Sequence, residues 1–306
     1  MYVTLSSPLN SALTPTDSLQ HASALKLSIP ASIAQRNWVK ILDWHTKFAL
    51  GLVASYHEDR ATAQNAVSML RERVSAQPFS GLEPYARMLS YLSGVLEQSG
   101  GSIESAFTTF SAPEFDLPDA ASGADFKTDI AILATMNRLL VVRNPSHPEH
   151  YLTQVLFAQL QPLCSSHPNL HIECAFRIIQ AINNPDETIN RQKTLIESTA
   201  NRAMKLKNMQ FVALCLNYMS SRFFADQVGD RPIKSVRAAR HVSKQGRSSL
   251  WRAVSLGICI STFQRNGMLE DANLCQQAFE EIRGKLPPAL GGGVSDADAE
   301  GDVDME

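Results

Sequence analysis

The sequence of 306 residues lacks several features that mark large classes of protein. It has no run of the roughly 18 apolar residues that a membrane-spanning helix needs, so no membrane span is expected. The opening residues, MYVTLSSPLN, lack the basic stretch and apolar core of a secretory signal, so none is expected either. No strand-like alternation survives comparison with the helical period. These absences favour an all-α protein that is not anchored in a membrane.

Catalytic signatures are also missing. The sequence contains no Walker loop, no GxGxxG, no nucleophile elbow and no HExxH. Serine, histidine and aspartate are plentiful, but nothing in their spacing brings them together at one site. We therefore expect no enzyme and no cofactor, and binding functions are the ones to weigh.

Cysteine is scarce, scattered and odd in number. There are five, and three of them (Cys215, Cys259 and Cys275) lie among apolar helix positions. This usage is typical of a reducing compartment in which thiols serve as small hydrophobic side chains.

One short cluster has to be tested as a metal site. Four potential ligands fall in a C-x2-H-x3-H-x2-C pattern: Cys164, His167, His171 and Cys174. Such a set could hold tetrahedral zinc. The spacing matches none of the usual zinc modules, and Cys174 lies on the apolar side of its predicted helix. We therefore expect no metal here.

Apolar residues recur at spacings of three to four over most of the chain, which predicts helices. Breakers rich in proline and glycine separate them. The predicted helices cover 30–56, 59–76, 83–98, 102–110, 125–143, 147–164, 170–182, 186–207, 211–223, 234–244, 248–265 and 269–283. Residues 111–123 are predicted to form a polar loop.

The helices show signs of a repeated hairpin. Gly94, Ala106 and Phe110 match the small, alanine and aromatic positions of a tetratricopeptide (TPR) repeat, although its early Trp and its Tyr are absent. Two later turns, at Gly229 and Gly267, are 38 residues apart, which suits a helix-hairpin repeat. The expected fold is an all-α, TPR-like repeat solenoid.

Composition divides the chain into three predicted parts. Residues 1–29 are an extended or poorly ordered lead, 30–285 form the repeat array, and 286–306 are a disordered acidic tail. Six acids and no base lie within 295–306. This tail could fold back on a basic stretch, discourage nonspecific binding to nucleic acid, or simply keep the chain in solution.

A basic stretch runs from Arg202 to Arg252. It holds eleven Lys/Arg and two Asp, for a formal charge of +9, whereas the whole chain is −2 and the remainder therefore sums to −11. Such an uneven distribution of charge indicates what kind of partner the chain binds, and says little about its fold. Within the stretch, Leu214 and Phe223 are expected in the core of a hydrophobic helix.

A basic helix follows that hydrophobic one. Five side chains fall within an arc of about 120° at 100° per residue: Lys234, Arg237, Arg240, His241 and Lys244. Four fall on the opposite side: Val236, Ala239, Val242 and Ser243. Asp230 is the expected N-cap, with Pro232 in the first turn.

The basic arc leaves two interpretations open. One is the solvated face of an ordinary packed helix; the other is a docking patch for a partner or for nucleic acid. Few aromatic residues accompany the charges, so little stacking on bases is expected. Contact with nucleic acid would be made to phosphates, and would be independent of sequence and sensitive to salt.

The residues of this stretch resemble a known family. The segments AMKLKNMQFVALCLNYMSSRFF (203–224) and SVRAARHVSKQGRSSLWRAVSLGIC (235–259) are similar to the C-terminal repeats of the cohesin loading factor family, in a fungal version. The resemblance is strongest over 186–290 and weaker over 30–185. Family members are usually longer, so the chain is expected to correspond to their C-terminal half.

The resemblance implies a non-catalytic scaffold in the nucleus that helps to load cohesin onto chromatin. The implied partner is the large HEAT-repeat loader subunit (adherin), with cohesin and chromatin receptors contacted indirectly. It also implies a basic docking patch, which we place at Arg222, Lys234, Arg237, Arg240, His241, Lys244 and Arg247. The alternative is a helical-repeat subunit of the proteasome lid, the signalosome or the anaphase-promoting complex.

Overall fold

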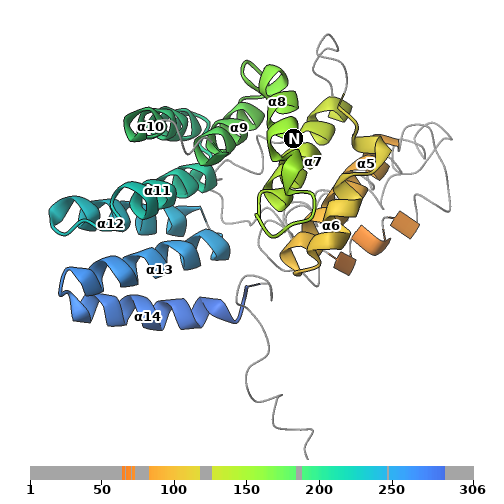
Figure 1. Ribbon diagram of the computed structural model, residues 1–306. Helices are drawn as coiled ribbons and strands as arrows, with labels where there is room; N and C mark the ends of the chain where they lie inside the picture. The colour runs from red at the N-terminus through yellow and green to blue at the C-terminus, as the bar shows by residue number, and fades with distance from the viewer. Residues whose placement is uncertain are drawn as a thin grey trace, which may run out of the picture. The chain divides into compact units, whose positions relative to one another are not determined.

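The computed structural model describes residues 64–65, 67–69, 71–72, 83–117, 126–183, 188–246 and 248–286 (Figure 1). Within these ranges the chain is all-helical and has no strand. It divides into two compact units: the first ends at Leu163 and the second begins at Cys164, with the turn Ser99–Gly101 grouped with the second.

The first unit is built on a shared core. Its helices are α5 (Glu83–Ser99), α6 (Ile103–Phe110), α7 (Phe126–Val142) and α8 (Thr153–Cys164). The first three of these bury Leu89, Phe110 and Ile130 in one apolar cluster. A hydrogen bond from Asn137 Nδ2 to Tyr91 Oη, 3.0 Å long, joins α7 to α5.

The TPR-like positions meet where α5 packs against α6. A Cβ atom on Gly94 would lie 2.6 Å from Cε1 of Phe110, so only glycine leaves room for that ring. Ala106 and Phe110 are themselves almost fully buried, at 0% and 2% exposure. The small-residue position of the repeat thus has a direct steric role.

Two predicted boundaries in this unit are wrong. The polar loop at 111–123 contains a 3-10 turn, Pro113–Phe115, and Phe115 is buried in the core. The helix predicted from His147 begins only at Thr153, after a 3-10 turn at His150–Leu152. Pro148 disfavours a helical start at His147, because the residue before a proline avoids the helical region.

The second unit contains six described helices that pack in chain order as paired hairpins. They are α9 (Leu170–Asn183), α10 (Ile189–Lys205), α11 (Met209–Phe223), α12 (Asp230–Gln245), α13 (Ser249–Arg265) and α14 (Leu269–Arg283). In Figure 1 the helices from α11 to α14 lie one beside the next. α11 also contacts α9 and α13, so alternate helices form a continuous layer. The predicted all-α, helical-hairpin architecture is confirmed for the described residues.

Glycine makes the turns before α12 and α14. Gly229 has φ +117° and Gly267 has φ +72°, values that favour glycine over other residues. Asn266 Oδ1 accepts a 2.7 Å hydrogen bond from the Gly229 N–H. Gly229 is the N-cap of α12, so the prediction that Asp230 caps this helix is wrong: Asp230 is its first residue.

α11 packs on two sides rather than one. Leu214 and Phe223, predicted as core residues, are only half-buried, while the polar Asn217 and Ser220 are buried. Asn217 Oδ1 accepts a 2.9 Å hydrogen bond from Ser255 of α13. Because α11 lies between α10 and α12 and also contacts α13, a single apolar stripe does not describe its burial.

Some predictions fall outside the described residues. These are the helix at 30–56, the lead 1–29 and nearly all of the tail 286–306, so the three-part division of the chain stays a prediction. The described residues between 64 and 72 are helical, as expected. No helix in the described ranges is both long enough and apolar enough to cross a membrane.

Candidate interaction surface on helix α12

Helix α12 has one buried side and one exposed side. Pro232, Val236, Ala239 and Ser243 are buried against the neighbouring helices. Of the four residues that the sequence placed on this side, Val236, Ala239 and Ser243 are buried and Val242 is half-buried. Ile233 lies inside the basic arc at the first turn of the helix, yet it is half-buried and packs against the core.

Hydroxyl groups hold the buried side of α12 in place. Ser243 Oγ donates to the carbonyl oxygen of Ala239 and also contacts Ser255 Oγ of α13. Ser235 and Ser220 join α12 to α11 through a 2.7 Å hydrogen bond. Small polar side chains allow close helix packing while satisfying their own hydrogen bonds. α12 is therefore a fixed support for the side chains on its outer face.

The outer side chains form what we call the α12 basic face. It comprises Lys234, Arg237, Arg240, His241 and Lys244, all of them exposed. From Asp230 to Gln245 the helix carries five Lys/Arg and one Asp, a formal charge of +4. Exposed cations on a rigid helix are available to an anionic partner.

Two of these cations are oriented toward α14. Arg237 Nη2 lies 3.4 Å from Asp271 Oδ2, and its guanidinium lies 5.7 Å from the centroid of the Phe263 ring. Arg240 Nη1 lies 3.5 Å from Cys275 Sγ. An exposed ion pair contributes little stability, typically about 0.2–1 kcal/mol, so these contacts orient the arginines more than they hold the fold.

The other members of the face have fewer partners. His241 Nε2 lies 3.0 Å from Gln245 Nε2, one turn further along α12. Lys234 and Lys244 make no ion pair with any residue that the structure describes. Arg222, at the end of α11, is exposed, whereas Arg247 falls outside the described residues. The Asp271 contact lies 34 positions from Arg237, and no local pattern in the sequence could have shown it.

The possible metal ligands near Cys164 are used in other ways. His167 Nδ1 accepts a 3.0 Å hydrogen bond from the Asn169 N–H, and His171 Nδ1 lies 3.1 Å from Asn208 Nδ2. Burial lowers the pKa of His171. Among the described residues, no group of three or more His, Cys, Asp or Glu is arranged to hold a metal ion.

The thiols provide a direct check on the packing. All five cysteines are fully buried, and burial raises the pKa of Cys164, Cys215 and Cys259 to about 12. At pH 8 a thiol with that pKa is thiolate in only about one molecule in 10⁴, and thiolate is the reactive form. We expect no cysteine of the native chain to react with a thiol reagent within minutes, and all five to react after unfolding. Rapid reaction of a native thiol would contradict this packing.

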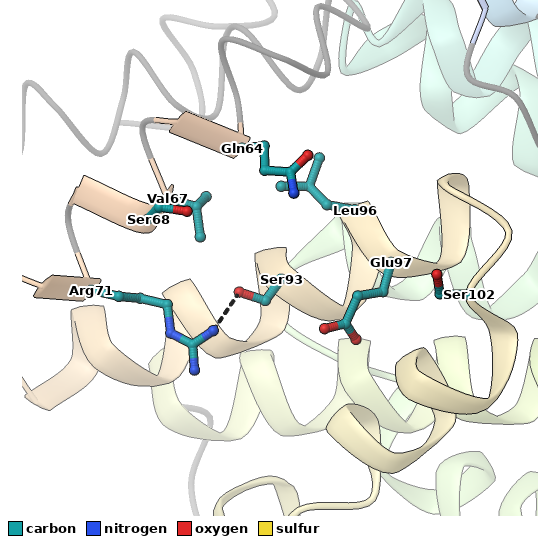
Figure 2. Close-up of a pocket in the computed structure, with 8 residues that line it drawn as sticks. All are labelled: Gln64, Val67, Ser68, Arg71, Ser93, Leu96, Glu97 and Ser102. Atoms are coloured by element: carbon teal, nitrogen blue, oxygen red, sulfur yellow. Dashed lines mark hydrogen bonds between the residues drawn. The ribbon is translucent and has the colours of Figure 1, made fainter. Parts of the chain in front are cut away.

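A small cavity opens in the first unit (Figure 2). It encloses about 240 Å³ between the helical residues near 64–72 and α5, below the roughly 300 Å³ of most ligand sites. Arg71 Nη1 donates to Ser93 Oγ at 3.3 Å, as the dashed line shows. Glu97, which supplies the one carboxylate of the lining, accepts a 2.9 Å hydrogen bond from Thr109 Oγ1.

Comparison with known proteins identifies the family. Neither the curated proteins nor the solved structures include a significant match to this chain. The family model described as cohesin loading factor matches residues 6–270, which is most of the chain. That range includes the described helices from α5 to α13. The chain therefore belongs to the cohesin loading factor family, and this membership implies a role in cohesin loading.

Proposed function

We propose that this chain is a non-catalytic scaffold subunit of the cohesin loading complex and promotes the loading of cohesin onto chromatin for sister chromatid cohesion. The family match over residues 6–270 carries the proposal. Stacked helical hairpins, which present long surfaces to extended partners, are consistent with it. The chain would work in the nucleus and would use no cofactor, with ATP hydrolysis left to cohesin.

The proposed main partner is the large HEAT-repeat loader subunit. The repeat array would hold an extended segment from the N-terminal region of that subunit. Helix α11 contacts both α9 and α13, so these alternate helices supply a continuous surface within the second unit. Contacts with cohesin and with chromatin receptors would be indirect or weaker.

We assign the docking of chromosomal receptors to the α12 basic face, together with Arg222 and Arg247. Its exposure and its charge of +4 support an acidic receptor surface. Direct contact with DNA through the same cations would be nonspecific and would weaken steeply with salt.

Charge reversal tests this assignment. In the triple variant Arg237→Glu, Arg240→Glu and Lys244→Glu, we expect recruitment to chromatin to fall about three- to tenfold, because exposed interface charges act mainly on the association rate. The fold should persist, since an exposed substitution usually changes stability by about 0.5 kcal/mol or less. Of the three substitutions, Arg237→Glu should reduce stability the most, because Arg237 forms an ion pair with Asp271. Chromatin fractionation and circular dichroism measure the two effects.

A second triple variant is the matched control. Arg143, Arg191 and Arg283 are exposed and lie outside the basic stretch, and their reversal changes the net charge by the same amount. This variant should bind chromatin as the unmodified chain does. Equal losses in both variants would show that net charge matters rather than the α12 basic face.

Loss of the chain from cells tests the function itself. Chromatin-bound cohesin should fall when the chain is removed and return when it is restored. Normal chromatin-bound cohesin in the absence of the chain would contradict a role in loading.

A further inference from the structure

We propose that the acidic segment 295–306 binds the α12 basic face of its own molecule and shields it from other anionic partners. The segment itself lies outside the described residues. The inference is built on the face that receives it, the point where the chain leaves the fold, and the charge pattern of the segment.

The described chain ends within the apolar core that α12, α13 and α14 share. Leu286, its last residue, is buried at 7% exposure in the same apolar cluster as Val236 of α12. The Lys285 N–H donates to the Ile282 carbonyl oxygen at 2.8 Å, so the chain stays against the fold up to this point. The following residues therefore start from a fixed position within the second unit.

Contacts between α14 and α12 show toward which end of α12 the chain leaves the fold after Leu286. Asp271 lies beside Arg237, and Cys275, four residues on, lies beside Arg240. The two helices therefore run in the same direction, and the C-terminal end of α14 lies near the C-terminal end of α12. The last described residues therefore leave the fold toward the Lys244 end of the basic face, and not toward its Lys234 end.

The connecting residues are long enough. Eight residues separate Leu286 from residue 295, and a Gly-rich linker of that length would span about 16 Å on average. From Lys244 back to Lys234 is about 15 Å along the axis, at 1.5 Å per residue. An extended chain rises about 3.3 Å per residue, so the segment is long enough to cover that length, and a short linker keeps its local concentration high, of about millimolar order.

The charge pattern suits an extended occupant. The six acids occupy every second position from Asp296 to Glu306, and small or apolar residues lie between them. In an extended chain, alternate side chains point to the same side and are about 6.6 Å apart. Successive turns of a helix are about 5.4 Å apart, so carboxylates and cations can pair along the face. Asp271 already shows that a carboxylate fits against it.

Zero-length carbodiimide cross-linking of the full chain tests the contact. Asp and Glu of the segment should link to Lys234 and Lys244, the two lysines of the face, and not to Lys193 or Lys205 on α10. The yield should not depend on protein concentration. It should drop at least about fivefold between 0.1 M and 1 M salt, where the screening length shortens from about 10 Å to about 3 Å. Even use of all four lysines would overturn the proposal. A yield that rises with concentration would also overturn it, by assigning the segment to a second copy.

Binding to a DNA duplex of arbitrary sequence tests the shielding. The variant has every Asp of 296–306 changed to Asn and every Glu to Gln. It should bind the duplex about three- to tenfold more tightly than the unmodified chain at 0.1 M salt, with a difference below about twofold at high salt. Equal binding at 0.1 M would contradict shielding. The contact itself does not depend on the loader function, because cross-linking reports it whether or not the chain binds a loader partner.

Discussion

Phe263→Ala is expected to destabilise the second unit by about 3–5 kcal/mol. Phe263 is 1% exposed in α13 and lies in the cluster that includes Val236, Leu256 and Cys259. Removing its ring leaves a cavity that the rigid neighbouring helices can fill only in part. Urea unfolding measures the loss, and hydrogen exchange should locate it in α12 to α14.

Leu274→Ala is the control for this substitution. Leu274 lies on α14 in the same unit but is 59% exposed. The change should alter stability by about 0.5 kcal/mol or less. A similar loss in both variants would mean that Leu274 is covered, or that Phe263 is not a core residue as described.

Gly94→Ala is expected to destabilise the first unit by about 1–3 kcal/mol. The added methyl group would lie 2.6 Å from the Phe110 ring, which is itself buried and has little room to move. Overpacking of this kind exceeds the gain of up to about 1 kcal/mol in helix propensity from replacing glycine. Hydrogen exchange of amides in α5 and α6 measures the effect within the unit.

Gly257→Ala should stabilise the chain, whereas Gly94→Ala should destabilise it. Gly257 lies inside α13, and a Cβ there would meet no atom within 4 Å. We expect a gain of about 0.5–1 kcal/mol, since glycine in a helix interior costs that much relative to alanine. If both substitutions stabilise the chain, the close approach of α5 and α6 at Gly94 is wrong.

Much of the fold could be predicted because local signals agree with tertiary packing. Gly229 and Gly267 mark turns, and both adopt the left-handed conformations that favour glycine. The apolar period placed the helices of the second unit within a few residues of their observed ends. On α12 the 100° rotation per residue separated the buried side from the exposed one, because the residues that this helix buries against α11 and α13 lie on one side of it.

The same helical period failed to predict the buried residues of α11, because α11 packs on more than one side. On α11 the apolar residues Leu214 and Phe223 are half-buried, whereas Asn217 is buried and bonded to Ser255, 38 positions away. Hydropathy cannot reveal a polar side chain whose partner lies on another helix. The contacts of Arg237 with Asp271 and Phe263 escaped prediction for the same reason.

The measurement that tests the central claim most directly is co-purification of the chain with the N-terminal region of the large loader subunit, at about 0.15 M and about 1 M salt. Screening at 1 M is nearly complete beyond about 3 Å, so contacts of the exposed basic face should not survive it. A scaffold that holds its partner along packed helices should retain it at both salt concentrations, and that is the predicted result. Failure of the folded chain to bind at either concentration, with helical circular dichroism intact, would contradict its assignment as a cohesin loader scaffold.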